Sequence, residues 1–332
     1  MSTDTVFLTG GTGFVGSWVA EELLSRGLRV RALVRSDPKW LAGLPVQTVR
    51  GDLHDADALA EGAQGAAYVV HVAGLTRAHT QDALDRANVR GTLNLLDAVD
   101  REAPDVRRVL VTSSLEAHGP NRLRPDGMPV PAVESDPLRP ISMYGRSKER
   151  MEAAIASDYP DLPVTVVRPP AVYGPREADL FEMVRAAQRG LFAVTGRDDV
   201  PRLSLVHARD LARGMADVLL SDRSAGEAYF VSSARAYTWA EVRAALEAAL
   251  GRRTRQLTLP APVIALAGTA AQAWGRVTGT LPPLTRDKAV AARHAWTCDA
   301  SKAQKHVGYR PTVGLEEGWA ETVAWYRAEG WL

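Results

Sequence analysis

A tyrosine and a lysine four residues apart carry the clearest chemical signal in this chain of 332 residues. They are Tyr144 and Lys148, in a predicted helix that begins near Met143. Because side chains four positions apart share one helix face, the ammonium would lie beside the phenol. The ordinary pKa of a phenol is about 10, and a neighbouring cation favours the phenolate. The pair therefore predicts a general acid/base that operates near neutral pH.

Two serines, Ser113 and Ser114, follow a predicted strand at 108–112, and a proline-rich loop separates them from the helix of Tyr144. A serine hydroxyl within reach of the phenol would orient a carbonyl or alcohol oxygen. A tyrosine and a lysine at this spacing often occur by chance on helices. Placed after a glycine-rich first turn and a strand that ends in serines, the pair becomes a specific signal.

A glycine-rich segment lies between a predicted strand at 5–9 and a predicted helix at 17–26. Glycines at positions 10, 13 and 16 would let the backbone turn tightly, approach a pyrophosphate and pack the helix on the sheet. The helix N-terminus would then face the phosphates. A second strand at 29–34 follows where a βαβ unit requires it, which favours dinucleotide binding over a loop used only for packing. The expected cofactor contacts are Gly10, Thr12, Gly13, Phe14, Val15 and Gly16.

The tip of the second strand indicates which dinucleotide is bound. A dinucleotide fold uses an acidic side chain there for a free ribose 2′-hydroxyl, or a cation for a 2′-phosphate. This chain has Arg35, with Lys39 close by in sequence. Arginine can pair with a phosphate and stack on adenine, so NADP(H) is favoured over NAD(H). The alternative is a solvated arginine with no cofactor role.

Two further predicted strands, at 46–50 and 67–72, end in residues suited to the cofactor. Asp52 can accept a hydrogen bond from the adenine amino group, although an aspartate after a strand is also an ordinary helix cap. The small side chains of Ala73 and Gly74 would allow a close approach of the cofactor. The expected contacts here are Asp52, Leu53, Val72, Ala73 and Gly74.

Composition and charge narrow the class of partner. Forty basic residues against 39 acidic ones leave a net charge of +1, which argues against nucleic acid and against an anionic membrane surface. The lone cysteine, Cys298, excludes an internal disulfide and a thiolate metal cluster, and the histidines do not gather at ligand spacing. The longest apolar stretch, 257–274, is broken by prolines and falls short of the ~20 residues of a spanning helix. We expect a cytoplasmic protein with a small-molecule substrate, no membrane span and no metal.

At this point the sequence resembles the extended short-chain dehydrogenase/reductase superfamily over nearly its whole length. Besides the glycine motif and the Tyr144/Lys148 pair, four segments carry the resemblance: 88–92 (Asn-Val-Arg-Gly-Thr), 168–175 (Arg-Pro-Pro-Ala-Val-Tyr-Gly-Pro), 205–211 (Leu-Val-His-Ala-Arg-Asp-Leu) and 299–311, which runs from Asp-Ala-Ser-Lys to Tyr-Arg-Pro. The resemblance implies that Ser114, Tyr144 and Lys148 are catalytic.

The resemblance also implies roles for residues outside the catalytic set. The backbone around Pro170 to Val172 would meet the nicotinamide carboxamide, which adds Pro170 and Val172 to the cofactor contacts. Asn88 would either support the helix that braces the site or serve as a plain capping or packing amide. His207 and Arg209 would fasten the two lobes together.

Two departures from the superfamily patterns bear on the reaction. Nucleotide-sugar epimerases carry an asparagine that grips the diphosphate where this chain has Ala171. Sugar dehydratases carry an Asp-Glu pair where this chain has Leu115 and Glu116. What remains resembles the branch with dihydroflavonol-type and 3β-hydroxysteroid-dehydrogenase-like reductases. The expected substrate contacts are Thr76, Leu115, Glu116 and Tyr173; the apolar segment 257–285 is either a wall of the substrate site or an ordinary packed cap helix.

These observations predict an NADP(H)-dependent oxidoreductase that interconverts a carbonyl and a secondary alcohol on a small, apolar substrate, with Tyr144 as general acid/base. A nucleotide-sugar epimerase/dehydratase with tightly bound NAD(P) is the alternative in the same fold. A non-catalytic NADP-binding sensor or scaffold is a third possibility, but such proteins often lose the tyrosine or the lysine.

The predicted fold is α/β, with a Rossmann-type doubly wound parallel sheet and a smaller, mostly helical C-terminal substrate-binding lobe. Residues 1–174 would form the NADP-binding domain, to which 203–232 return, and 175–202 with 233–332 would form the cap. We expect helices at 179–188, 238–250 and 315–329, a strand leading into a helix over 205–220, and a strand at 228–231. We also expect a homodimer formed through a helix pair that includes the helix of Tyr144.

Overall fold

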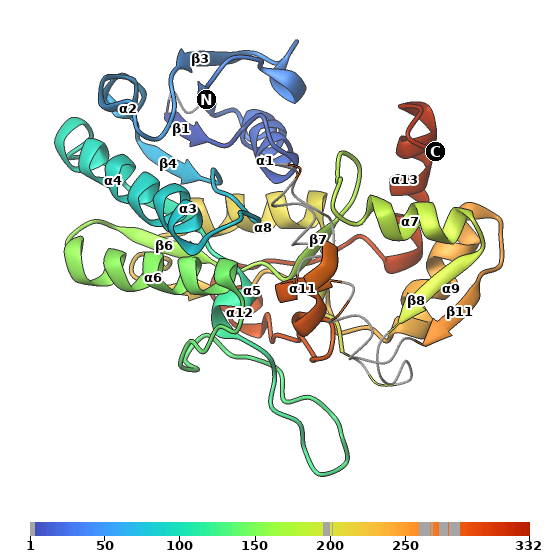
Figure 1. The fold of residues 1–332 in the computed structure, drawn as a ribbon. Helices are drawn as coiled ribbons and strands as arrows, with labels where there is room; N and C mark the ends of the chain where they lie inside the picture. Colours follow the sequence, from blue (N-terminus) through green and yellow to red (C-terminus); the bar gives the residue numbers. More distant parts are fainter. Residues whose placement is uncertain are drawn as a thin grey trace.

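A parallel sheet of seven strands lies at the centre of the larger lobe (Figure 1), in the order β10-β6-β5-β4-β1-β2-β3. The computed structural model describes residues 4–194, 200, 202–258, 266, 268–271, 278 and 286–332. The inner strands are apolar on both faces because helices cover both sides of the sheet. The strands are β1 (Thr5–Thr9), β2 (Arg29–Val34), β3 (Val46–Arg50), β4 (Tyr68–His71), β5 (Arg108–Thr112), β6 (Val164–Val167) and β10 (Ala228–Tyr229).

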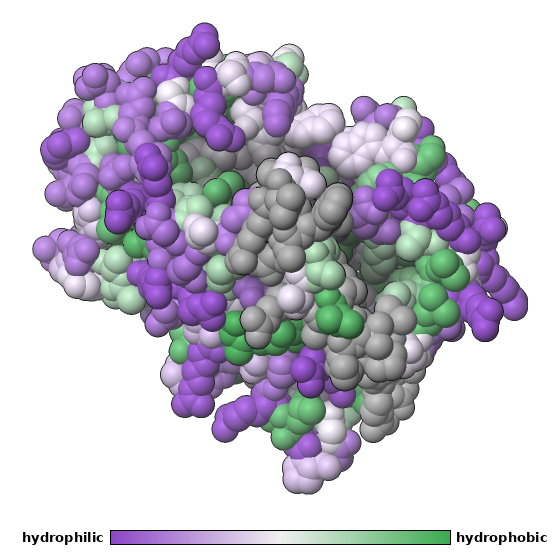
Figure 2. Space-filling view, viewed as in Figure 1, coloured by the Kyte–Doolittle hydropathy of each residue, from purple (hydrophilic) through white to green (hydrophobic). Residues whose placement is uncertain are grey.

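Helices cover both faces of this sheet, which confirms the doubly wound prediction. On one face α1 (Phe14–Ser25) packs against α8 (Ala208–Leu220), and both contribute to one apolar cluster with the sheet. A second cluster fills the other face. The helices there are α2 (Ala56–Ala63), α4 (Gly91–Glu102) and α6 (Met143–Asp158). Hydrophilic side chains dominate the surface over α2 and α4 (Figure 2).

The smaller lobe is mostly helical and has its own apolar core. Trp319, Val323 and Tyr326 lie in this core, as their helical spacing predicts. The capping box between Thr238 and Glu241 starts α9 as predicted, and Gly251 ends that helix in the left-handed conformation, with φ of +68°. The elements of the lobe are α7 (Phe181–Gln188), α9 (Trp239–Leu250), α13 (Leu315–Ala328) and the paired strands β8 (Leu191–Val194) and β11 (Arg255–Thr258).

Segments from the second half of the chain return to the larger lobe. The strand predicted at 205 is β9 (Leu205–His207), but it pairs with β7 (Ala171–Tyr173) in a separate two-stranded sheet. Further along, α12 (Ser301–His306) packs Ala303 into the cluster of α1 and α8. Lys302 on the same helix donates hydrogen bonds to Glu227 and to the Ala228 carbonyl oxygen. The domain boundaries at 174 and 232 stay predictions.

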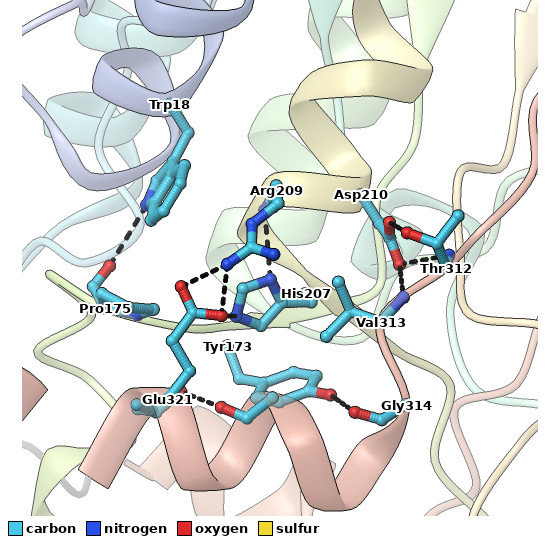
Figure 3. A network of polar contacts seen from close by, with 12 residues as sticks. Trp18, Tyr173, Pro175, His207, Arg209, Asp210, Thr312, Val313, Gly314 and Glu321 are labelled. Carbon is cyan, nitrogen blue, oxygen red and sulfur yellow. Dashed lines mark hydrogen bonds and ion pairs between the residues drawn. The ribbon is translucent and has the colours of Figure 1, made fainter. Parts of the chain in front are cut away.

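Polar side chains of β9, α8 and α13 contact one another where the two lobes meet (Figure 3). Arg209, at the start of α8, donates to both carboxylate oxygens of Glu321 on α13 at 2.6 Å. His207 Nε2 lies 3.7 Å from the same carboxylate, and the ring stands edge-on to Tyr173. Burial lowers the pKa of His207, which favours the neutral ring. The ion pair between Arg209 and Glu321 therefore joins α8 to α13, which agrees with the role predicted for Arg209; the neutral His207 ring packs against Tyr173.

Across the described part of the chain, no helix combines the length and the apolar character needed to cross a bilayer.

Candidate active site

The predicted cofactor residues lie along one edge of the sheet. All seven strands run parallel, so their carboxyl ends meet at the same edge, where open α/β sheets bind ligands. Gly10 follows β1, Arg35 follows β2, Asp52 comes after β3, Ala73 comes after β4 and Ser114 comes after β5. The structure therefore brings together residues from five separate parts of the chain.

The glycine-rich loop is built for close backbone approach. Gly10 has φ of +77°, and a Cβ placed there would lie 2.5 Å from the Ala73 nitrogen. A Cβ on Gly16 would lie 2.1 Å from the Gly10 oxygen, so both positions require glycine. Gly13 is the N-cap of α1, and no side chain in the described residues caps this helix start. An exposed helix N-terminus with uncapped N–H groups fits a pyrophosphate.

The residues expected at the adenosine end lie on the surface. Arg35 and Lys39 are both exposed, directly after β2 and at the start of the short helix η1 (Lys39–Leu41). Asp52 is exposed as well, and its carboxylate accepts a hydrogen bond from the His54 backbone. The alternative role of Asp52 as a helix cap is wrong, because Asp55 caps α2 by accepting from the Ala58 N–H.

The structure distinguishes the two serines at the end of β5. Ser113 is buried and donates its hydroxyl hydrogen to Glu152, which in turn pairs with the buried Arg168. Ser114 is only half-buried and starts the short helix α5 (Leu115–His118). It forms a hydrogen bond with the Tyr144 phenol that lowers the pKa of Tyr144. Ser114 is therefore the serine that adjoins the phenol, as the resemblance implied.

The pKa of Tyr144 moves opposite to the direction that the tyrosine-lysine pair predicted. Burial and the nearby Glu116 carboxylate raise it well above the ordinary value, and the hydrogen bond from Ser114 opposes this only in part. The Lys148 ammonium donates to the Thr112 carbonyl oxygen at 2.7 Å instead of stabilising the phenolate. The phenol therefore holds its proton at neutral pH and is suited to act as an acid.

Lys148 lies between the catalytic helix and the predicted cofactor wall. A Cβ on Gly74 would be 3.6 Å from the Lys148 Nζ, so the ammonium adjoins the loop after β4. Burial lowers the pKa of Lys148 to about 8, while the Glu152 carboxylate acts in the raising direction. Asn88 braces this region from the π-helical turn η2 (Arg86–Arg90), because its amide bonds both to the Leu75 backbone and to the Ser147 hydroxyl. The supporting role of Asn88 is thus confirmed over that of a plain capping amide.

A pocket opens beside Tyr144, and it contains two of the four residues predicted to contact substrate. These two are Thr76 and Glu116. Leu115 is instead buried against Ala132 and Phe230, and Tyr173 is buried in the cap, where it stacks on Trp319. Most of segment 257–285 lies outside the described residues. The pocket lining is Thr76, Arg77, Ala78, Leu84, Glu116, Ser142, Met143, Tyr144, Asp287 and Ala291.

Of the seven lining residues that sequence reasoning missed, two form side-chain hydrogen bonds next to Tyr144. Ser142 is the N-cap of α6, and its hydroxyl donates to Glu116 at 2.6 Å. Asp287, on α11 (Arg286–Ala291), accepts a hydrogen bond from the Met143 backbone N–H at 2.7 Å. A serine before a helix is a recognisable cap signal. Asp287 has no such signal, because it lies 144 residues from its partner.

Two replacements of Asp287 distinguish the effect of its hydrogen bond to Met143 from the effect of its negative charge. Asp287→Ala removes the acceptor for a helix N–H and the cap-side contact beside Tyr144, so kcat/KM should fall about three- to tenfold, as for the loss of a helix cap. Asp287→Asn keeps an acceptor oxygen and should retain most of the activity. Steady-state kinetics of the two variants checks this. Equal losses in both would show that the charge matters and not the hydrogen bond.

Comparisons with known proteins agree with this geometry. The model of the NAD dependent epimerase/dehydratase family matches residues 6–232. The ceramide reductase of Caulobacter vibrioides is 33% identical over 355 residues, which cover 100% of this chain and 98% of that protein. The 4-hydroxy-2-methyl-3-oxo-4-farnesyl-3,4-dihydroquinoline-1-oxide ketoreductase of Stigmatella aurantiaca is 35% identical, covering 68% of this chain and 67% of that protein. The crystal structure of gox2253 has a TM-score of 0.79 and 29% identity over 99% of both chains.

The chain belongs to the NAD dependent epimerase/dehydratase family, which confirms its resemblance to the extended short-chain dehydrogenase/reductases. Family membership and the reductase relatives make it an NAD(P)-dependent oxidoreductase. Within the described ranges, no group of three or more His, Cys, Asp or Glu side chains is arranged to hold a metal ion.

Proposed function

We propose that this protein is an NADP(H)-dependent reductase that interconverts a carbonyl and a secondary alcohol on a small, apolar substrate. One observation carries the proposal: the Tyr144 phenol lines the pocket, holds its proton at neutral pH and is hydrogen-bonded to Ser114. Lys148 lies one helical turn further on, beside the loop after β4. The proton donor Tyr144, the orienting hydroxyl of Ser114 and the loops expected to bind the cofactor thus all lie at the carboxyl end of the sheet.

Each residue of the candidate site has a separate role in the proposed carbonyl reduction. NADPH, when bound, supplies the hydride that adds to the carbonyl carbon. The Ser114 hydroxyl orients the carbonyl oxygen, and Tyr144 donates its proton to that oxygen as negative charge develops. Lys148, beside the loop after β4, would hold the ribose side of the cofactor. The glycine loop at α1 would hold the pyrophosphate, and Arg35 with Lys39 would hold the 2′-phosphate.

The pocket favours a neutral substrate. Its apolar lining comes from Leu84, Met143 and Ala291, while Glu116 and Asp287 contribute negative charge. The lining cation, Arg77, is paired with Asp179 at 2.9 Å. An anionic group beside Tyr144 would meet two carboxylates, whereas a neutral ketone would not. The two reductases among the reported relatives carry names that include a ceramide and a farnesyl group, which supports an apolar carbonyl compound.

The epimerase alternative finds less support in the same site. Ala171 is exposed at the start of β7, where a methyl group offers no hydrogen bond to a nucleotide diphosphate. Leu115 lies in the apolar core at 3% exposure, so the position that holds an acid in sugar dehydratases cannot serve one here. We still test the alternative, because the family includes epimerases and dehydratases by its description.

A substrate panel tests the proposal. Purified protein is mixed with NADPH and hydrophobic ketones, aldehydes or nucleotide sugars, and the nicotinamide absorbance is followed. We expect oxidation of NADPH with apolar carbonyl compounds and none with nucleotide sugars. Conversion of a nucleotide sugar with no net use of cofactor would replace the reductase by the epimerase. NADPH binding without turnover on any substrate would favour the non-catalytic sensor.

Light scattering of the same sample tests the expected homodimer.

The reduction should lose efficiency above about pH 8. Because the pKa of Lys148 is lowered to about 8, the ammonium is present below that pH and is lost as the pH rises through it. The kcat/KM profile, which reports ionisations of the free enzyme, should therefore fall on the alkaline side from about pH 8. In Lys148→Arg the cation persists, so this limb should move to higher pH. An unchanged limb in the arginine variant would assign it to another group.

A further inference from the structure

A buried histidine outside the proposed chemistry sits where the cofactor cradle meets the sheet. His71 ends β4 and is 1% exposed. Its Nδ1 lies 2.6 Å from the Thr9 hydroxyl oxygen at the end of β1, and its Nε2 lies 2.9 Å from the Thr92 hydroxyl oxygen on α4. Both ring nitrogens therefore have a partner, and each partner belongs to a different element.

The directions of these hydrogen bonds follow from a count of hydrogens. The single hydroxyl hydrogen of Thr92 is donated to the Asn88 carbonyl oxygen at 2.6 Å, so the Thr92 oxygen must accept from His71 Nε2–H. In the neutral ring Nδ1 is then an acceptor, and Thr9 must donate to it. Burial and the nearby Lys148 lower the pKa of His71 to about 3, which agrees with a neutral ring. The tautomer is therefore set by its surroundings.

The chain of hydrogen bonds continues to the catalytic helix. The Asn88 side-chain amide donates to the Ser147 hydroxyl at 2.8 Å, and that hydroxyl donates to the Tyr144 carbonyl oxygen at 2.7 Å. At the other end, Thr9 directly precedes Gly10 of the glycine loop. A buried series of hydrogen-bonded residues thus connects the glycine loop, through β4 and η2, to the backbone of Tyr144.

We propose that His71 is a positioning residue that couples the glycine loop to the Tyr144 helix through Thr9, Thr92 and Asn88. The single hydroxyl hydrogen of Thr92 fixes the tautomer of His71 and therefore the donor role of Thr9, and Asn88 continues the path through its side-chain amide. Loss of either hydrogen bond to His71 leaves a buried donor or acceptor unpaired. The His71 ring and the side chains next to it can then adopt other rotamers. The effect on the reaction rests on the proposed reductase function, whereas the effect on cofactor binding does not.

A double-mutant cycle on the two threonines tests the coupling without removing the histidine, whose replacement could unfold the sheet edge. Thr9→Val and Thr92→Val keep side-chain shape and each delete the hydrogen bond to His71; Thr92→Val also deletes the donation to the Asn88 carbonyl oxygen. NADPH affinity is measured by fluorescence titration, and the hydride step by single-turnover kinetics. We expect each variant to weaken NADPH binding about five- to tenfold, because each loses its buried hydrogen bond to His71. The double variant should be little worse than either single one, because one broken bond already interrupts the path.

Matched controls separate coupling from general damage. Thr165→Val, on β6, deletes a fully buried hydroxyl that donates to the Glu227 carbonyl oxygen and lies outside the path. It should lower Tm similarly and leave both readouts unchanged. Thr92→Ser should restore both. Additive losses in the double variant, or equal losses in Thr165→Val, would overturn the proposal. If no carbonyl compound is reduced, the reductase function fails, and the cycle on NADPH affinity alone still decides the coupling.

Discussion

Replacing Tyr144 with phenylalanine is expected to lower kcat for carbonyl reduction by about 10²- to 10⁴-fold, the usual contribution of a positioned general acid. The substitution keeps the ring and removes the hydroxyl that lies in the pocket next to Ser114, where it can protonate the substrate oxygen. Affinity for NADPH should stay nearly unchanged, because the glycine loop and Lys148 are untouched. Stopped-flow kinetics and a fluorescence titration of NADPH measure the two quantities separately.

Tyr159→Phe provides the matched control for that variant. Tyr159 directly follows α6, at the opposite end of that helix from the pocket, and its hydroxyl donates to Asp97 at 2.6 Å. It should turn over at the wild-type rate. A comparison of Ser113→Ala with Ser114→Ala adds a second internal test, since only Ser114 adjoins the phenol. Retained turnover in Tyr144→Phe would remove the phenol from the mechanism.

Replacing Arg35 with aspartate is expected to reverse the cofactor preference. The exposed guanidinium after β2 would form charge-assisted hydrogen bonds with a 2′-phosphate, and the new carboxylate would repel that phosphate and accept from a free 2′-hydroxyl. The ratio of kcat/KM for NADPH to that for NADH should fall by about 100-fold or more, given the strength of hydrogen bonds to charged groups. Initial rates with both cofactors at several salt concentrations measure it.

The control for Arg35→Asp is Arg29→Asp. Arg29 is exposed at the opposite end of the same strand, so the change in net charge is identical while the predicted phosphate position is left alone. The preference ratio of this variant should match that of the wild type. An unchanged ratio in Arg35→Asp would contradict the 2′-phosphate role and leave Lys39 as the cation to examine.

Features that depend on neighbouring residues could be predicted from the sequence. The glycine loop, the serines after β5 and the tyrosine-lysine pair are each contained in a few consecutive residues, and the structure brings them to one sheet edge. The capping box of α9 is similarly local. Hydrophobic periodicity predicted α13 and its buried Trp319, because an amphipathic helix must bury its apolar face.

Features that depend on distant packing could not be predicted. Asp287 contacts Met143 across a separation of 144 residues, and a single acidic residue in the sequence gives no sign of such a contact. Tyr173 belongs to a motif placed next to the site, yet its side chain turns into the cap core and stacks on Trp319. The raised pKa of Tyr144 arises from burial and from Glu116, which local spacing to Lys148 does not report.

Isotope labelling shows whether the hydride passes from NADPH to the carbonyl carbon of the substrate. NADPH carrying deuterium at the transferable position of the nicotinamide is mixed with the enzyme and an apolar ketone, and the product is analysed by mass spectrometry and NMR. We expect deuterium at the carbinol carbon of the product, formed by the wild-type protein and by Tyr159→Phe but not by Tyr144→Phe. A product without deuterium, or a nucleotide sugar epimerised while the labelled cofactor is conserved, would contradict it.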